Sequence, residues 1–372
     1  TMTWDPSGYG SHAETSLPGP ATVWYLAEGA THSNFDLFYT LQNANAAPAA
    51  VTVRYLLPGG QAPIDKPYVV PENSRFNIWV DNEEFPAGSG NRTLQATDVS
   101  ARVTSDLPII VERSMYLSTP ARLFDAGHES AGVTEPGLDW FLAEGATGDY
   151  FDLFVLIANP NETDAQVRAT YLLRDGTTLT KDYTVLPNSR FIIWVDVEQF
   201  PQDSGNRMLA DADVSTMITS TNGVPIIVER AMWWPGPTPA TWAEAHNSAG
   251  STATGVKWAL AGGEMGGARN AQTYITIANT SAYAGQARVT LYFEDGSAAA
   301  EATVDLPAQS RTNFYPPDFF PGAFPAGGHR RFASIVESLG ATPAQIVVER
   351  SVYSNAGVSW AAGTNALATR LQ

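Results

Sequence analysis

The sequence contains no cysteine among its 372 residues. Disulfide bonds, thiolate metal sites and cysteine nucleophiles are therefore excluded. Lysine is scarce as well, because Lys66, Lys181 and Lys257 are the only lysines among 21 basic residues. No apolar run approaches the length that a membrane-spanning helix needs. We therefore expect no membrane insertion.

Positive charge is in deficit, since 21 basic residues stand against 38 acidic ones and the formal net charge is −17. A chain with this excess repels nucleic-acid phosphates and anionic lipid headgroups. Known catalytic signatures are also missing, including Gly-x-Ser-x-Gly, His-Glu-x-x-His and the phosphate loop. A paired-carboxylate hydrolase stays open as an alternative. We expect no nucleic-acid partner and no enzymatic activity, and we assign no catalytic residue.

The most prominent feature present is a repeated hexapeptide, Pro-Ile-Ile-Val-Glu-Arg. It occupies 108–113 and 225–230, and a looser copy, Gln-Ile-Val-Val-Glu-Arg, occupies 345–350. Aligning the chain with itself gives three copies that open at Trp24, Trp140 and Trp258, which are 116 and 118 residues apart. Repeats of this length are typical of whole domains in tandem rather than of solenoid units.

Each copy reads as six or seven short strands separated by Gly-, Pro- and Asn-rich turns, with almost no helical periodicity. The last two strands of the first copy, 98–105 and 109–116, are expected to pair with each other. This pattern predicts an all-β chain of three tandem β-sandwich domains of about 115 residues each, joined by structured linkers. The expected boundaries are 1–21 for a leading tail, then 22–137, 138–255 and 256–372 for the repeats.

The linkers have a constant length, because His12, His128 and His246 each lie twelve residues before an opening Trp. A flexible linker would not need a fixed length, so we expect these segments to pack on a domain. Met2 and Trp4 resemble the residues that follow the other Glu-Arg pairs. The first residues are therefore expected to continue from a missing preceding repeat.

The ordered motifs Trp-x-x-Ala-Glu-Gly, Ser-Arg after a proline, Val-Ser-x-x-x-x-Ser and Pro-Ile-Ile-Val-Glu-Arg resemble the sensory rhodopsin transducer family. They are also similar to tandem modules in the C-terminal regions of large secreted bacterial proteins. The resemblance implies a compact β-sandwich for each repeat. The transducers assemble as tetramers and bind a membrane photoreceptor, but the tandem arrangement here is closer to the secreted modules.

The Glu-Arg dipeptides place opposite charges on opposite faces of a strand, so one charge of each pair is expected to be partly buried. Buried charges need partners, and the other charges that recur in each copy are candidates. We expect structural ion pairs that fix strand register, with a ligand-binding carboxylate as the alternative. The residues concerned are Glu28, Arg75, Glu112, Arg113, Glu144, Arg190, Glu229, Arg230, Arg311, Glu349 and Arg350.

Two Trp-Val-Asp triplets suggest a binding surface. Strand alternation would place Trp79 with Asp81, and Trp194 with Asp196, on an outer sheet face, and the third copy offers Tyr315. An aromatic ring beside a carboxylate can stack on a sugar and accept its hydroxyl hydrogen bonds. Carbohydrate binding is one interpretation, and packing of the Trp beneath a linker or a neighbouring domain is the other.

Metal sites need three or four converging ligands, and the single linker histidines do not supply them. The Asp-bearing loops 203–206 and 211–213 could bind calcium through oxygen ligands, although their spacing matches no known calcium loop. We expect no cofactor and no metal, with calcium as the alternative. The expected function is extracellular or cell-surface adhesion or carbohydrate binding, with polysaccharide or other copies of the chain as partners. A purely structural stalk, surface-layer or filament subunit is the alternative.

Overall fold

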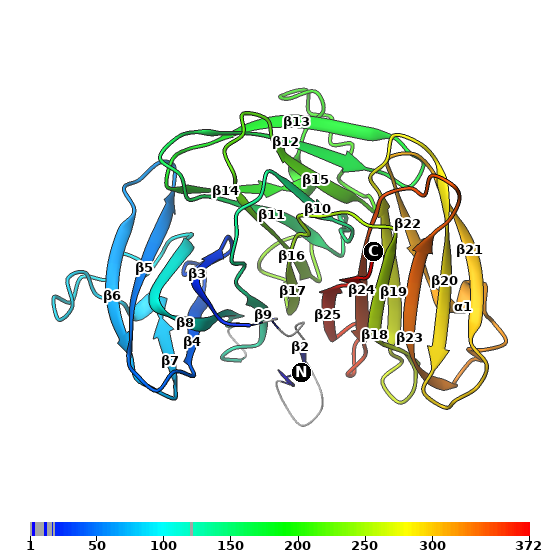
Figure 1. Ribbon diagram of the computed structural model, residues 1–372, viewed down its shortest axis with the longest axis horizontal. Helices are drawn as coiled ribbons and strands as arrows, with labels where there is room; N and C mark the ends of the chain where they lie inside the picture. The colour runs from blue at the N-terminus through cyan, green and yellow to red at the C-terminus, as the bar shows by residue number, and fades with distance from the viewer. Residues whose placement is uncertain (1, 4–10, 13–16, 18, 120–121) are drawn as a thin grey trace.

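A computed structural model describes residues 2–3, 11–12, 17, 19–119 and 122–372. The regular secondary structure of the described chain is almost entirely β-strand, so the expected all-β class is confirmed. The three sequence repeats follow one another along an arc, and short strands between them gather on its inner side (Figure 1). No helix in the described ranges is long and apolar enough to cross a membrane.

Repeat 1 consists of two sheets that share one long strand, β8. One sheet contains β3, the first half of β8, β5 and β6, and the other contains β9, the second half of β8, β4 and β7. A short 3-10 helix, η1 (Val80–Asn82), follows β7. The strand bounds are β3 Ala21–Leu26, β4 Phe35–Asn43, β5 Ala49–Pro58, β6 Ile64–Val70, β7 Ser74–Trp79, β8 Ser100–Leu117 and β9 Ala126–Ala131.

Repeat 2 has the same two sheets, in the orders β10-β15-β12-β13 and β17-β16-β11-β14. The 3-10 helix η2 (Val195–Val197) follows β14 at the position that η1 has in repeat 1. The strand bounds are β10 Asp139–Leu142, β11 Asp152–Asn159, β12 Ala165–Leu172, β13 Thr178–Val185, β14 Ser189–Trp194, β15 Ser215–Ser220, β16 Ile227–Trp234 and β17 Glu244–Ala249.

Repeat 3 has sheets ordered β21-β20-β23-β18-β26 and β22-β19-β24-β25. A four-residue helix, α1 (Pro316–Phe319), begins the insertion that distinguishes this copy. The strand bounds are β18 Lys257–Gly266, β19 Gln272–Asn279, β20 Gly285–Phe293, β21 Ala300–Leu306, β22 Ser310–Phe314, β23 His329–Ser338, β24 Ile346–Ser354, β25 Ala362–Leu367 and β26 Thr369–Arg370.

The opening Trp of each repeat ties the two sheets together. Trp24 is buried, and its indole N–H donates to the carbonyl of Ile109 at 2.9 Å. Trp140 and Trp258 make the same bond to the carbonyls of Ile226 and Ile346. A buried indole N–H needs such a partner, so the first motif of each copy is joined to the hexapeptide that closes it.

The strand that ends in Asn is stabilised by a second repeated network. The Asn159 side-chain amide is buried and donates to the carbonyls of Thr163, Val185 and Leu186 at 2.8 to 3.1 Å. Asn43 and Asn279 also donate to three carbonyls each in their own copies. The Asn therefore begins a turn, and its amide also holds the neighbouring strand end.

The predicted pairing of 98–105 with 109–116 is wrong. In repeat 1 both segments belong to the single strand β8, which crosses from one sheet into the other. In repeat 2 the corresponding strands β15 and β16 lie in opposite sheets. Each half-strand buries its apolar face by pairing with a different set of neighbours, so a local hairpin would leave one sheet without its central strand.

The linkers form strands of their own. β9, β17 and β25 each extend the sheet of the repeat that they follow, through antiparallel pairing with β8, β16 and β24. His128 and His246 are buried within them. β1 (Met2–Thr3) pairs with β2 (Ser11–His12), whose side chains lie outside the described part of the chain, as does Trp4.

Candidate functional site

The junctions between repeats hold the most distinctive chemistry of the molecule. The Arg113 guanidinium of repeat 1 donates to the Glu229 carboxylate of repeat 2 at 2.6 Å, and both side chains are buried. Arg230 of repeat 2 makes the same bond to Glu349 of repeat 3, also at 2.6 Å. The middle hexapeptide therefore gives its Arg to the next repeat and its Glu to the preceding one.

The second oxygen of each glutamate is also used. Glu229 accepts the backbone N–H of Ala27 at 2.7 Å, and Glu349 accepts that of Ala143 at 2.8 Å. The arginines donate in addition to the backbone carbonyls of Glu28 and Glu144. A buried ion pair gains from further hydrogen bonds to both partners. Both junctions supply such bonds at equivalent atoms, while Nε and Nη2 of both arginines have no hydrogen-bond partner in the described chain.

A second arginine crosses each junction in the opposite direction. Arg190 of repeat 2 donates to the carbonyls of Gly29 and Val99 in repeat 1 and lies 3.6 Å from Asp98. Arg311 of repeat 3 donates equivalently to Gly145 and Val214 in repeat 2. Backbone pairing supports this contact, because Ser189 and Arg190 of β14 pair in parallel with Leu57 and Pro58 of β5.

These contacts define two sides of a repeat. We call the side with the Ala-Glu-Gly loop and the hexapeptide arginine the donating face (Ala27, Glu28, Gly29 and Arg113 in repeat 1). We call the side with the Ser-Arg arginine and the hexapeptide glutamate the receiving face (Arg190 and Glu229 in repeat 2). Each junction joins a donating face to the receiving face of the next repeat.

The loop carboxylates Glu28 and Glu144 are buried inside these junctions. Burial alone would raise the pKa of Glu28, but His128 and Arg113 beside it hold that pKa below its ordinary value. Arg311 and Arg230 lower the pKa of Glu144 in the same way, against the effect of burial. Both carboxylates thus act as fixed negative charges among the arginines.

The expected ion-pair residues are found mainly between repeats rather than within them. The residues at the outer ends of the array have no such partner repeat. Arg75 is exposed, and Glu112 and Arg350 are half-buried, whereas their counterparts at the junctions are buried. The third copy also lacks the loop glutamate, and Arg350 donates to the carbonyl of Gly262, which replaces it.

The expected outer face shared by Trp and Asp is not formed. β7 and β14 end at Trp79 and Trp194, and the next residues turn into η1 and η2. The turn directs Asp81 back to accept the N–H of Leu37 at 2.9 Å, and Asp196 accepts that of Leu153 at 2.8 Å. Strand alternation fails here because the strand ends at the Trp itself.

The Asp carboxylates have unusual titration behaviour as a result. Burial raises the pKa of Asp81 to about 6 and that of Asp196 to about 7, although the bound backbone N–H groups act in the opposite direction. The nearby Asp152 carboxylate adds to the increase at Asp196. These side chains fasten the strand end, and they are not presented to an external ligand.

Each receiving face carries a cluster of four aromatic rings. In repeat 2, Phe154 packs on Trp194 with centroids 5.4 Å apart, and Trp233 stacks on Trp242 at 5.2 Å. Phe35 of repeat 1 reaches this cluster and meets Trp233 edge-on at 5.0 Å. In repeat 3, Tyr274 with Tyr315 and Tyr353 with Trp360 form the matching pairs, and Phe151 of repeat 2 contacts both Tyr353 and Trp360.

The junction of repeats 1 and 2 leaves a hollow of about 230 Å³. Its walls are mainly apolar, with Trp194, Trp233 and Trp242 on the side of repeat 2 and Phe35 on the side of repeat 1. Asp98 and Arg190 supply polar groups at its edge. This combination of aromatic walls and a few polar groups is typical of small-molecule sites.

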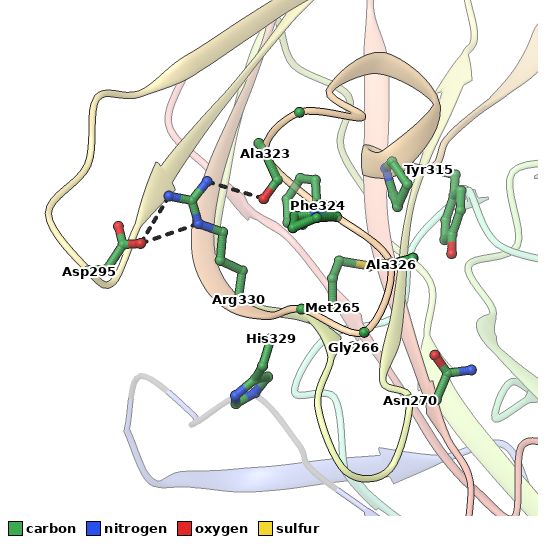
Figure 2. A pocket seen from close by; sticks show the side chains of 15 residues that line it. Met265, Gly266, Asn270, Asp295, Tyr315, Ala323, Phe324, Ala326, His329 and Arg330 are labelled. Atoms are coloured by element: carbon green, nitrogen blue, oxygen red, sulfur yellow. Dashed lines mark hydrogen bonds and ion pairs between the residues drawn. The ribbon is translucent and has the colours of Figure 1, made fainter.

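A second hollow, of about 470 Å³, lies in repeat 3 beneath the insertion that follows α1 (Figure 2). Arg330 crosses it, donating to Asp295 at 2.9 Å and to the carbonyl of Ala323 at 3.2 Å. The Arg330 guanidinium also lies 4.0 Å above the centre of the Phe293 ring. Arg330 therefore holds the insertion against the sheet, while Tyr315 stands at the rim.

In the part of the chain that the structure describes, no group of three or more His, Asp or Glu side chains is arranged to hold a metal ion. Asp213, from the expected calcium loops, instead pairs with Arg174 at 3.1 Å. Asp203 turns with a positive φ of 59° in an exposed loop. The absence of a cofactor stays a prediction, with calcium as its alternative.

Sequence reasoning missed the aromatic contacts that cross the junctions. Phe35 and Phe151 stand at equivalent positions, eight residues before the buried Asn of each copy, and this spacing was visible in the sequence. Trp242 and Trp360 lie within the linkers, where no strand pattern marks them. Their partners lie in another repeat, so no pattern within one copy could identify the contacts.

We expect Arg230→Met to lower the free energy of unfolding by about 3–5 kcal/mol, because Glu349 would remain buried without its cation. The double variant Arg230→Met/Glu349→Met should recover most of this loss. Urea denaturation followed by tryptophan fluorescence measures both. Arg168→Met, which breaks an exposed pair with Asp182, is the control and should change little. If Arg230→Met were as stable as the parent, the buried pair would not be important for stability.

We expect the stability contributed by Asp196 to fall as the pH rises. Its folded pKa, about 7, lies above the ordinary value, so the protonated form is favoured by folding and the contribution is lost as pH passes upward through 7. The denaturation midpoint of the parent minus that of Asp196→Asn should therefore decrease as the pH is raised from 5 to 8. Asp305→Asn, on an exposed strand position, is the control. A constant difference across this range would refute the assignment.

No protein-family model matches the chain, and no curated protein matches it. Among solved structures, Thermotoga maritima 1070 is similar at 13% identity, covering 32% of this chain and 97% of its own, with a TM-score of 0.27. The Anabaena sensory rhodopsin transducer is similar at 23% identity, covering 26% of this chain and 99% of its own, with a TM-score of 0.22. Each match spans about one repeat, and the likeness is a distant one of fold alone.

Proposed function

We propose that the chain is a non-catalytic structural element, a rigid arc of β-sandwiches that spaces or assembles parts of a larger secreted or cell-surface protein. The observation that carries this proposal is the buried Arg–Glu pair that recurs between successive repeats. Flexibly tethered domains have polar, loosely packed contacts, whereas these junctions bury complete charge networks.

The linkers support the same function. β17 lies against both β9 and β25, so the middle linker strand contacts the other two as well as its own repeat. The Asn247 side chain of β17 donates to Glu28 of repeat 1 at 2.6 Å, and His246 lies 3.2 Å from the Tyr353 hydroxyl of repeat 3. One linker therefore contacts both neighbouring repeats, which restricts bending at each junction.

We expect small-angle X-ray scattering to give one compact arc whose radius of gyration is unchanged from about 0.05 to 1 M NaCl, because buried pairs are screened far less than exposed ones. Arg113→Met/Glu229→Met, which removes both charges of one junction, tests whether the pair fixes this shape. Arg168→Met is again the surface control. An expanded, salt-dependent ensemble of the parent would overturn the proposal.

A second candidate function is carbohydrate binding, and the hollow between repeats 1 and 2 favours it. Trp194 and Trp242 offer ring faces for stacking, and Asp98 and Arg190 offer hydrogen-bond partners for hydroxyl groups. This site differs from the outer sheet face expected from the sequence, because the Trp is used without the neighbouring Asp. Adhesion through a polysaccharide would be the corresponding role.

We expect a glycan array to show binding by the parent that Trp194→Ala abolishes. Trp79→Ala is the matched control, because Trp79 has the same position in repeat 1 but is exposed on a receiving face that no described repeat covers. Melting temperatures of both variants check that the fold is retained. Absence of binding by the parent, or equal loss in both variants, would exclude sugar binding at this hollow.

A further inference from the structure

The receiving face of repeat 1 has the composition of a repeat junction, but no repeat in the described chain covers it. Its four rings pair as they do in the other copies, with Phe38 5.2 Å from Trp79 and Tyr116 4.9 Å from Phe124. Trp79 is 42% exposed, whereas its counterpart Trp194 is half-buried. Tyr116 is half-buried, whereas its counterpart Trp233 is only 2% exposed. The same surface is therefore buried at one position in the array and open at another.

The charged groups of this face show the same contrast. Glu112 and Arg75 stand where Glu229 and Arg190 stand in repeat 2, and they line a surface hollow of about 470 Å³. At the junction, Leu57 and Pro58 of the preceding repeat cover the corresponding strand. Glu129 of β9 adds a second carboxylate beside Glu112; burial and this neighbouring charge raise the pKa of Glu129. An incoming cation would relieve the repulsion between these carboxylates.

The opposite end of the array shows a matching deficit of negative charge. Arg350 occupies the position from which Arg113 and Arg230 reach the glutamate of the next repeat. Gly262 replaces the loop glutamate beside it, and Arg350 donates to the carbonyl of Gly262 instead. A sandwich placed between repeats 3 and 1 would bring a glutamate to Arg350 and an arginine to Glu112.

The linker strands mark where such a sandwich belongs. β17 lies between β9 and β25, and β2 contacts both β25 and β9 on the remaining side. Four linker strands thus surround one centre, and three of them follow a described sandwich (Figure 1). A second complete copy of the chain would not suit this place, because its other repeats would overlap the repeats already arranged around the centre.

We propose that the receiving face of repeat 1 is a docking surface for one further β-sandwich of the same repeat type, joined ahead of β2, which closes the arc into a four-membered ring. The docked sandwich contributes an arginine to Glu112, loop carbonyls to Arg75 and an aromatic ring to the cluster around Trp79. This inference rests on the proposed scaffold, since it extends the same junction by one step.

The test uses the whole chain with residues 138–231 placed ahead of Met2, so that residues 2–21 serve as the linker of the added repeat. Because the chain has no cysteine, a single Asn77→Cys substitution on the exposed part of β7 reports access to the receiving face. We expect its alkylation rate to fall at least tenfold in the four-repeat chain relative to the 372-residue chain. Ser204→Cys, in an exposed loop of repeat 2, should react equally in both.

Charge reversal supplies the specificity control. Glu112→Arg in the four-repeat chain should restore the alkylation rate of the three-repeat chain, whereas Glu294→Arg, an exposed reversal in repeat 3, should not. The docking surface is overturned if the Asn77→Cys thiol of the four-repeat chain is not protected from alkylation. It is also overturned if Glu112→Arg leaves that protection unchanged. Small-angle X-ray scattering of the unextended chain tests the scaffold proposal separately. If that chain is a rigid arc but the Asn77→Cys thiol of the four-repeat chain reacts without protection, the docking surface is refuted and the scaffold proposal is not.

Discussion

The arrangement of this protein depends on a buried arginine that binds the glutamate of the next repeat. Arg113–Glu229 and Arg230–Glu349 are buried ion pairs in which each carboxylate also accepts a backbone N–H. Such a pair contributes less to stability than to specificity, because a sandwich in any other orientation would leave both charges buried and unpaired. The contact therefore selects one relative orientation of neighbouring repeats.

That selection is directional. A repeat presents backbone carbonyls and an arginine on its donating face, and a glutamate, an arginine and aromatic rings on its receiving face. The two faces are complementary to each other and not to themselves, so joining repeats leaves one face of each kind at the ends of the array. Heterologous contacts of this kind produce either open chains or closed rings, according to the rotation at each step. The linker strands around a common centre correspond to the closed case.

The sequence was sufficient to predict the fold class and the repeat period, because strand alternation and the constant Trp and His spacing are local signals. It also identified the charged residues of the junctions. It could not assign their partners, because Arg113 could pair with Glu28 of its own copy or with Glu229 of the next. Only the packing of one repeat on the next determines which pairs form. The prediction for Trp79 and Asp81 failed for a local reason, since nothing in the sequence marks the end of β7 at the Trp.

The chemistry of the donating face has a consequence for how such arrays change over evolutionary time. Arg190 and Arg311 recognise carbonyl oxygens of the main chain, which every residue type supplies. A duplicated repeat therefore presents these carbonyl acceptors to its neighbour whatever side chains its loop carries. After a tandem duplication of the gene, the contacts of this arginine with the main chain would therefore survive sequence changes in the loop.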